Sequence, residues 1–515
     1  MLNFKNYVIM KNIKYFLIFL TITFWSCDDF LDKYPHDELS DNTFWKNEEE
    51  LQMGLTACYG LMQNEYISSA TGSGDKVYWD GLTDNAFVSD FWGLQEFYSG
   101  DQNPTNDLAG GLYSKCYNVV AAVNSFLSKI DLVDIEQEKK NKYIAEARFI
   151  RAYVYHELVL NFGGVPLFSS EPTIESASVG RSTKEEVMTL INNDLDFAIE
   201  NLPDESYTGH VVKNSARGLK ARVLLYGDDW SGVAQYTQDI MSSGKTSLYT
   251  NYKNMFINEG QGDDNTEILF SIKFLAPEEW HNIDYRVGGP SHINVLEDLV
   301  NDYLTINGLP IDEDPIYNPD SLHKNRDPRL QQTIFCEEGE PWIYDVNNGY
   351  TYYFTNNTTK FSCKKYIDES VQASHVTQSD QDIVLLRYGD VLLMYAEAKN
   401  ELGQFGQNEW NQSIRLIRER AGFIVSQALD FPGGNQSNLR EIIRHERRIE
   451  MAFEGFRYYD LLRWGNIKEV WENIEGENPQ VRQYNENKPL FPIPESQIDY
   501  YNNNDIPFEQ NPGYN

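Results

Sequence analysis

Residues 146–167 read EARFIRAYVYHELVLNFGGVPL, which predicts a helix followed by an abrupt end. At about 100° per residue, Ala147, Ile150, Val154 and Leu158 form one apolar stripe, and other apolar side chains fill most of the remaining helix surface. A helix with this pattern is buried on more than one side, so it lies between other helices. The stretch therefore predicts an α-solenoid or a helical body of several layers.

The charges of this helix lie at two edges, and its end is enforced by the residues that follow. Arg148 and Arg151 are on one edge, and Glu146 and Glu157 are roughly opposite. Because a buried charge needs a partner, each of these side chains should reach a neighbouring helix. The sequence GGVP at 163–166 supplies a left-handed C-cap and then a proline that prevents continuation.

Further helical signals come in pairs on both sides of the first stretch. Before the middle of the chain the pairs are 111–130 with 136–162 and 183–201 with 215–226. Helical pairs thus account for about 111–230. A short connection between two helices places them antiparallel and in contact, which agrees with a layered helical scaffold.

The helical period lapses between about 245 and 382. Gly, Asn, Asp and Pro are frequent there, and a β-like run, EILFSIKF, occupies 267–274. A loop of this length without structure of its own is improbable inside a compact body. We therefore expect an ordered, irregular insertion of mixed loops and short strands that carries a functional surface.

Helical pairing resumes at about 383 and continues to 465. Asp390 is placed to act as the N-cap of a helix that ends at Gly403, and 408–420 follows after a short loop. This hairpin is of the kind seen in tetratricopeptide repeats, and a further helix is expected at 439–453. The spacing is too irregular for a consensus array, so the sequence predicts a mainly α fold on a tetratricopeptide-like scaffold.

The N-terminal segment 1–26 is predicted to be a secretory signal. Lysines precede an apolar run that begins at Phe16, and Ser26 stands directly before Cys27. This arrangement resembles a bacterial lipoprotein signal, in which the cysteine sulfur takes up lipid and becomes the mature N-terminus. An ordinary cleaved signal is the alternative, and Met1 and Met10 both remain open as the true start.

Composition narrows the classes of protein to consider. The 515 residues are long enough for one large or two ordinary domains, and 41% hydrophobic residues can build a core. The net charge of −35 repels phosphate backbones and argues against nucleic-acid binding. After the signal, the longest apolar run, 383–396, is interrupted by Arg387 and Asp390, so it does not predict a membrane-spanning helix.

The remaining cysteines give no metal or redox motif. Cys58, Cys116, Cys336 and Cys363 are widely spaced and form no CxxC sequence. One or two disulfides are open to them in an oxidising compartment, and their pairing is left undetermined.

A series of motifs occurs in order along nearly the full length of the chain. The motifs are the signal with Cys27, DDFLDKYP at 28–35, TFW at 43–45, the stretch 146–167, DPR at 327–329, LLRYGDVLLMYAEAKNELG at 385–403, ERRIEMAFEGFRYYDLLRWG at 446–465, LFPIP at 490–494 and QNPGY at 510–514. Together they resemble the SusD/RagB family of outer-membrane nutrient-binding lipoproteins of Bacteroidota. A small departure is Gly389, where the family commonly has Ala.

The resemblance implies a single SusD-like domain over 27–515, preceded by the lipoprotein signal. Its helical half would dock on a SusC-like TonB-dependent transporter, and its irregular parts, about 65–110 and 245–382, would bind the ligand. Members of the family usually bind oligosaccharides, and a minority bind peptides. Asp28 and Asp29 resemble an export tag for a surface-exposed, lipid-anchored protein of the outer membrane, although two aspartates can also be a solvated linker.

The candidate ligand-binding residues are aromatic and polar side chains in poorly helical sequence. A sugar ring offers an apolar face flanked by hydroxyl groups, and aromatic planes with nearby Asp, Asn and Arg match this chemistry. The alternative for any single tryptophan is a small hydrophobic cluster beneath a loop. The candidates are Trp79, Asp80, Asp84, Asn85 and Trp92 in 77–92, Trp280, Tyr285 and Arg286 in 277–290, and Trp342 in 342–354.

The arginines of the helical motifs are interpreted as structural. They lie among apolar residues with carboxylates nearby, which favours ion pairing over anion binding. The partners expected for them are Glu146, Glu397, Glu446, Glu450, Glu454 and Asp460. The arginines are Arg148, Arg151, Arg387, Arg447, Arg448, Arg457 and Arg463.

An enzyme and a calcium site are the remaining alternatives. The sequence has no GxSxG, HExxH or P-loop motif, but a glycoside hydrolase needs only two suitably placed carboxylates and has no short signature. The resemblance implies a binding protein without catalytic residues or cofactors. Acidic residues gather at 258–267 and 312–314 without EF-hand spacing, so a solvated acidic loop is favoured over structural calcium.

Overall fold

The computed structural model describes residues 44–66, 76–88, 93–171, 173, 179–276, 278–281, 283–288, 293–337, 339–345, 350–353, 358–368, 372–373, 379–474 and 482–514. The predictions for the signal segment, the export tag, Cys27 and Trp92 lie outside these residues. No helix within them is both long and apolar enough to cross a bilayer.

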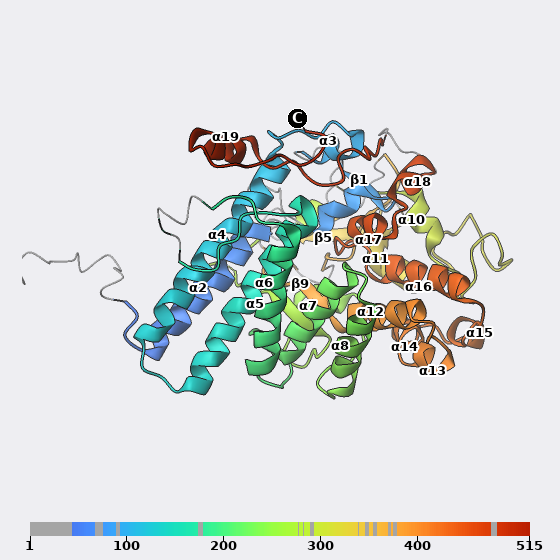
Figure 1. Ribbon diagram of the computed structural model, residues 1–515. Coiled ribbons are helices and arrows are strands. Elements are labelled where there is room, and N and C mark those ends of the chain that lie inside the picture. The colour runs from blue at the N-terminus through green and yellow to red at the C-terminus, as the bar shows by residue number, and fades with distance from the viewer. Residues whose placement is uncertain are drawn as a thin grey trace, which may run out of the picture.

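The body of the protein is a row of helices, each packed against the next (Figure 1). The predicted helical-pair scaffold is confirmed, and the paired helices have nearly the predicted limits. In order of contact the row is α2 (Glu48–Tyr66), α4 (Asp107–Lys129), α5 (Gln137–Phe162), α6 (Lys184–Asn201), α7 (Lys213–Leu225), α8 (Trp230–Ser242), α12 (Tyr388–Glu401) and α16 (Gln436–Glu450).

Helix α5 lies between its neighbours, as its sequence predicts. From Glu146 to Phe162 every residue except Arg148 and Leu160 is buried. Arg151 donates to the carboxylate of Asp194 on α6 through Nε and Nη2, both at 2.8 Å, so its expected partner on a neighbouring helix is present. The C-cap differs from the prediction, because its φ of 71° is combined with a ψ of −127°, outside the left-handed helical region.

Several predicted limits in the second half are wrong. Strand β9 (Ile383–Arg387) runs directly into α12, so Asp390 lies inside the helix rather than at its N-cap. Its carboxylate instead pairs with Arg222 at 2.7 Å and Arg447 at 2.6 Å. The helix expected over 408–420 is two helices, α13 (Gln407–Asn411) and α14 (Ile414–Ala421), and α16 begins and ends three residues earlier than expected.

The irregular insertion contains short strands, as predicted, and it also contains short helices that were not predicted. Two antiparallel strands, β2 (Ile268–Ile272) and β9, pair beside α7. A four-stranded sheet has the order β1 (Ala86–Val88), β3 (Ile293–Val295), β7 (Ser362–Cys363), β4 (Ile334–Phe335). A three-stranded sheet has the order β6 (Tyr350–Tyr353), β5 (Pro341–Asp345), β8 (Gln372–Ala373), in which β5 and β8 are parallel.

Shorter helices complete the described chain. The C-terminal segments return across the molecule, and α19 lies at the upper left of the view with the chain end near α3 (Figure 1). These helices are α3 (Leu94–Ser99), α9 (Ile283–Gly288), α10 (Glu297–Asp302), α11 (Arg329–Thr333), α15 (Ser426–Leu429), α17 (Arg457–Trp464), α18 (Ile467–Glu472) and α19 (Glu495–Asn503), with a 3₁₀ helix, η2, at Lys76–Leu82.

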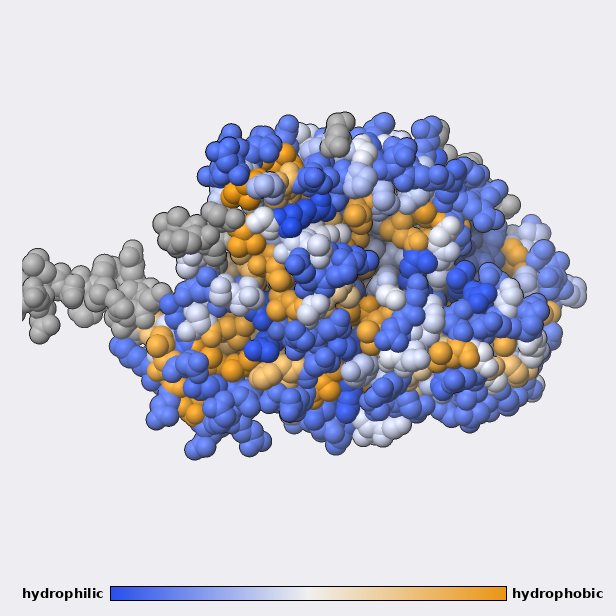
Figure 2. All heavy atoms as spheres, in the orientation of Figure 1, coloured by the Kyte–Doolittle hydropathy of each residue, from blue (hydrophilic) through white to orange (hydrophobic). Residues whose placement is uncertain are grey.

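One buried apolar cluster extends from Leu51 to Phe508 and joins the helical row to the insertion. On the face shown in Figure 2, hydrophilic residues cover most of the surface, and apolar patches gather over the helices at the left of the view. All four described cysteines are free thiols, so the structure contains none of the disulfides that the sequence left open. Burial raises the pKa of the Cys58 and Cys363 thiols to about 12.

A buried ionic network underlies the junction of the insertion with α16. Arg387 pairs with Glu267 at 3.1 Å, Glu450 at 2.7 Å and Glu454 at 2.8 Å. The pairs that continue from these acids contain five cations, Arg329, Lys365, Arg387, Arg418 and Arg420, and five carboxylates, Asp327, Glu267, Glu446, Glu450 and Glu454. Of the arginines predicted to be structural, Arg387 lies in this network. Arg447 pairs separately with Asp390 at 2.6 Å and Asp460 at 2.7 Å, and Arg463 pairs with Glu397 at 2.6 Å, so the predicted structural role is confirmed for these three.

Gly389, the departure noted in the sequence, lies beside this network. A Cβ atom at this position would collide with the guanidinium of Arg387 and come 3.1 Å from Oε1 of Glu267. The glycine thus leaves room for the Arg387 side chain at the start of α12.

Candidate functional site

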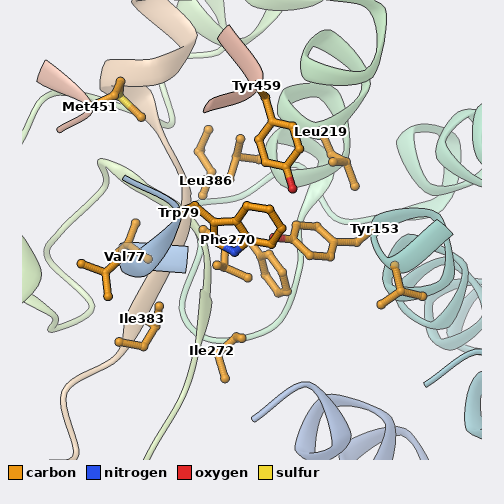
Figure 3. Close-up of a cluster of buried hydrophobic side chains, with 14 of the residues drawn as sticks. Val77, Trp79, Tyr153, Leu219, Phe270, Ile272, Ile383, Leu386, Met451 and Tyr459 are labelled. Carbon is orange, nitrogen blue, oxygen red and sulfur yellow. The ribbon is translucent and has the colours of Figure 1, made fainter. Parts of the chain in front are cut away.

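Trp79 lies in the core and not on a surface platform. Its side chain is 3% exposed, and its ring stacks on Phe491 with a centroid distance of 5.4 Å and an interplanar angle of 12°. Figure 3 shows it among Phe270, Tyr153 and Tyr459. The prediction that Trp79 stacks on a ligand is corrected, because its ring is buried against the aromatic side chains of Phe491 and Tyr459.

Asp80 and Asn85 are buried as well, and they hold η2 against the loop after α16. Asp80 accepts hydrogen bonds from the backbone amides of Phe453 at 3.1 Å and Gly455 at 3.2 Å, and from Asn85 Nδ2 at 2.7 Å. Burial raises the pKa of Asp80 to about 6 in spite of these donors. Both side chains have structural partners in place of a ligand.

Asp84 is the fourth predicted site residue that the structure assigns to the scaffold. Its carboxylate accepts from Arg457 at 2.9 and 2.8 Å and pairs with Arg448 at 2.9 Å. Burial alone would raise the pKa of Asp84, but the two guanidinium groups hold it well below its usual range. Segment 76–88 is thereby fixed to the C-terminal helical motif.

Trp280 is the predicted platform residue that the structure leaves accessible. It is 36% exposed and follows a turn that Leu275 and Glu279 close with two backbone hydrogen bonds of 2.9 Å. Leu275 in the same turn is 66% exposed. The side chains of Trp280 and Leu275 are therefore exposed to solvent on a turn that its own backbone hydrogen bonds stabilise.

His281 anchors this turn to the body of the protein. It is buried, its Nε2 lies 2.7 Å from the carbonyl oxygen of Gln381, and its backbone exchanges hydrogen bonds with Ser379 at 2.9 and 2.7 Å. The Phe274 ring meets the imidazole edge-on at 4.6 Å. The backbone at Trp280 is thus held next to a residue that is anchored to the body of the protein.

The hairpin of β5 and β6 supplies a second exposed aromatic residue. Tyr353, which pairs with Pro341 in this hairpin, is 56% exposed. Strand β8 pairs with β5 and ends at Ala373, only six residues before Ser379 beside the Trp280 turn. Six residues span at most about 22 Å, so Ala373 at the end of β8 lies within that distance of Ser379.

We call Leu275, Trp280 and Tyr353 the insertion face. Of the other predicted site residues, Trp342 is in β5, and Tyr285 and Arg286 are in α9, but their side chains lie outside the described part of the chain. Leu275 and Tyr353 were not singled out from the sequence. The YTYY run of β6, rich in residues that favour strands, is the sequence signal for a strand that contains Tyr353.

A cavity of 220 Å³ opens where α2 meets the end of β2. It lies at the base of the Trp280 turn, because β2 continues through Lys273 and Phe274 into that turn. Residues of α2 and β2 line it together with the loop residues Gly209 and His210.

Two carboxylates of the acidic loops that raised the question of calcium have protein partners. Glu267 is part of the buried ionic network, and Asp314 accepts hydrogen bonds from Thr305 at 2.6 Å and Asn307 at 3.0 Å. Within the described ranges, His, Cys, Asp and Glu side chains form no group of three that could hold a metal ion.

The chain is similar in sequence to family models and to known proteins. The SusD family model matches residues 245–514, and a model described as starch-binding and associating with the outer membrane matches residues 29–225. A SusD-like protein, P38, of Formosa agariphila is 26% identical over 88% of this chain and 90% of its own length.

Solved structures share the fold over almost their whole length. A SusD-like carbohydrate-binding protein from Bacteroides fragilis has a TM-score of 0.76 and 27% identity, and the match covers 89% of this chain and 99% of that protein. A laminarin-binding SusD-like protein has a TM-score of 0.70 and 24% identity, covering 91% of this chain and all of that one.

Proposed function

Because the chain belongs to the SusD family, we propose that it is a surface-exposed outer-membrane lipoprotein, anchored through Cys27, that binds oligosaccharides at the insertion face. We further propose that it delivers them to a SusC-like TonB-dependent transporter. Its role would be capture without catalysis, and transport would belong to the partner.

The observation that carries the proposal is the exposed Trp280 on its anchored turn. An indole offers a large rigid apolar plane with one N–H donor, which matches the apolar face and hydroxyl rim of a sugar ring. Two relatives support the same class of ligand: the B. fragilis structure is of a carbohydrate-binding protein, and another is of a laminarin-binding protein. Peptide capture and polysaccharide cleavage are the outcomes that the experiments below separate from glycan capture.

Replacement of Trp280 with alanine should weaken glycan binding by about thirtyfold, since a central aromatic contact contributes about 2 kcal/mol. Its free energy of unfolding should change by less than about 0.5 kcal/mol, because the side chain is substantially exposed. Isothermal titration of both proteins with the bound glycan measures the first effect, and urea denaturation measures the second.

The matched control is Tyr500→Ala, which removes an aromatic side chain that is 41% exposed on α19, outside the 245–382 insertion. It should leave glycan affinity within about twofold of the unmodified protein. Equal affinities for the unmodified chain and the Trp280 variant would show that the ligand binds elsewhere.

A further inference from the structure

The cavity beside α2 has a polarity that is unusual for this chain. Its lining includes two basic side chains, His210 and Lys273, and none of the described residues that line it is Asp or Glu. The whole sequence has 78 acidic against 43 Lys and Arg residues. A lining with basic but no acidic side chains therefore departs from the surface that surrounds it.

Each basic side chain has its carboxylate partner on the inner side. His210 Nδ1 lies 2.8 Å from Glu146, and Lys273 Nζ lies 2.5 Å from Asp382. The side chains of His210 and Lys273 are 61% and 44% exposed, whereas those of Glu146 and Asp382 are 1% and 8% exposed. The two pairs are thus oriented with their donors outward and their acceptors inward.

The two donors flank one opening. A Cβ atom at Gly209, the neighbour of His210, would lie 3.6 Å from Cε of Lys273. Met62, Phe270 and Ile272 are buried and form an apolar inner wall, and the Gln63 amide donates to the carbonyl oxygen of Lys273 at 2.5 Å. An acceptor-rich group with an attached apolar face fits this combination of wall and rim.

The size of the cavity limits the occupant. Its 220 Å³ is below the range of about 300–1,000 Å³ found for pockets that enclose drug-sized ligands, so it admits one ring and not a chain. Its lining ends at Lys273, which precedes the Trp280 turn in the chain, so further sugars of the same glycan would extend toward that turn.

Building on the glycan-binding function proposed above, we propose that this cavity is a subsite for a single sugar ring carrying an anionic group, with Lys273 and His210 as donors to that group. The anionic group is either a uronate carboxylate or a sulfate ester, which present the same acceptor oxygens. The ligand class is therefore an acidic polysaccharide.

The test is isothermal titration of the mature chain with trimers of glucuronate, galacturonate and mannuronate, a sulfated galactose trimer, and the neutral counterpart of each. At least one anionic trimer should bind about tenfold or more tightly than its neutral counterpart. The variants Lys273→Met and His210→Gln should each remove that preference and leave affinity for the neutral trimer within about twofold. The trimer that responds distinguishes carboxylate from sulfate.

The matched control is Lys468→Met, which removes a lysine that is 52% exposed and paired with Glu486 away from the cavity. It should keep the preference for the anionic trimer. Urea denaturation establishes that each variant is folded, and the two independent variants keep the test decisive if one of them is not. An equal affinity for anionic and neutral trimers, or a preference that survives in either variant when it is folded, would overturn the subsite.

The failure of this inference can be told apart from failure of glycan binding itself. Neutral glycans that bind with full affinity and lose it in Trp280→Ala, without any charge preference, would overturn only the acidic subsite. Absence of binding to every glycan, neutral or anionic, would overturn the proposed function together with the subsite.

Discussion

Replacement of Arg387 with methionine is expected to lower the free energy of unfolding by about 3–5 kcal/mol. The buried network has five cations and five carboxylates, so it is neutral as a whole. Removing Arg387 leaves the network with one net negative charge. Because the remaining side chains are almost completely buried, water cannot solvate that charge. Urea denaturation of the variant and the unmodified chain measures the difference.

The matched control for this prediction is Arg415→Met. Arg415 pairs with Glu419 one helical turn away on the surface, with 34% and 42% of the two side chains exposed. Such a pair contributes about 0.3–0.5 kcal/mol, so the control should remain close to the unmodified protein. The Arg387→Lys variant retains the charge but lacks the planar fork that contacts three carboxylates, and it should lie between the two. Equal stability of the Arg387 and Arg415 variants would contradict the role of the network.

Replacement of Trp79 with alanine is the second large effect, with an expected loss of about 3–5 kcal/mol of stability. The ring is buried and packs on Phe491, Tyr459 and Tyr458, so its removal leaves a cavity in the core. The comparison variant is Trp280→Ala, which removes the same type of side chain from the surface and should have almost no effect on stability. Thermal or urea unfolding of both variants compares them directly.

The two tryptophan variants separate scaffold from site. Trp79→Ala should bind glycan with unchanged affinity under conditions where it is folded, because its ring is buried in the core against Phe491. A folded Trp79 variant with normal stability, or a Trp280 variant that unfolds, would reverse the assignment of these residues.

The contrast between Trp79 and Trp280 also shows what local sequence can predict. Both occur in poorly helical stretches with nearby polar residues, and the sequence treats them alike. Trp79 is buried because Phe491 and Tyr459 reach it from about 400 positions later in the chain, and no local pattern contains that contact. Trp280 is exposed and follows a turn whose hydrogen bonds, between the backbones of Leu275 and Glu279, lie within the turn.

Helix positions were predictable to the extent that local signals decide them. The periodicity and burial of α5 follow from residues within the helix, and the Arg151 pair with Asp194 follows from the need to neutralise a buried charge. The prediction of Asp390 as an N-cap was wrong because its carboxylate forms ion pairs with Arg222 and Arg447 on two other helices. An N-cap hydrogen bond contributes about 1 kcal/mol. Breaking a buried ion pair costs about 3–5 kcal/mol, so the two ion pairs decide the position of Asp390.

The central claim is that the insertion face captures glycans, and isothermal titration of the mature chain from Asp28 tests it most directly. The panel comprises plant, host and microbial polysaccharides, with mixed peptides as the control and a reducing-end assay of each bound sample. We expect heat from one class of glycan, no release of reducing ends and no heat from the peptides. No heat of binding from any glycan together with heat from the peptides would contradict the account. Release of reducing ends from a bound glycan would also contradict it.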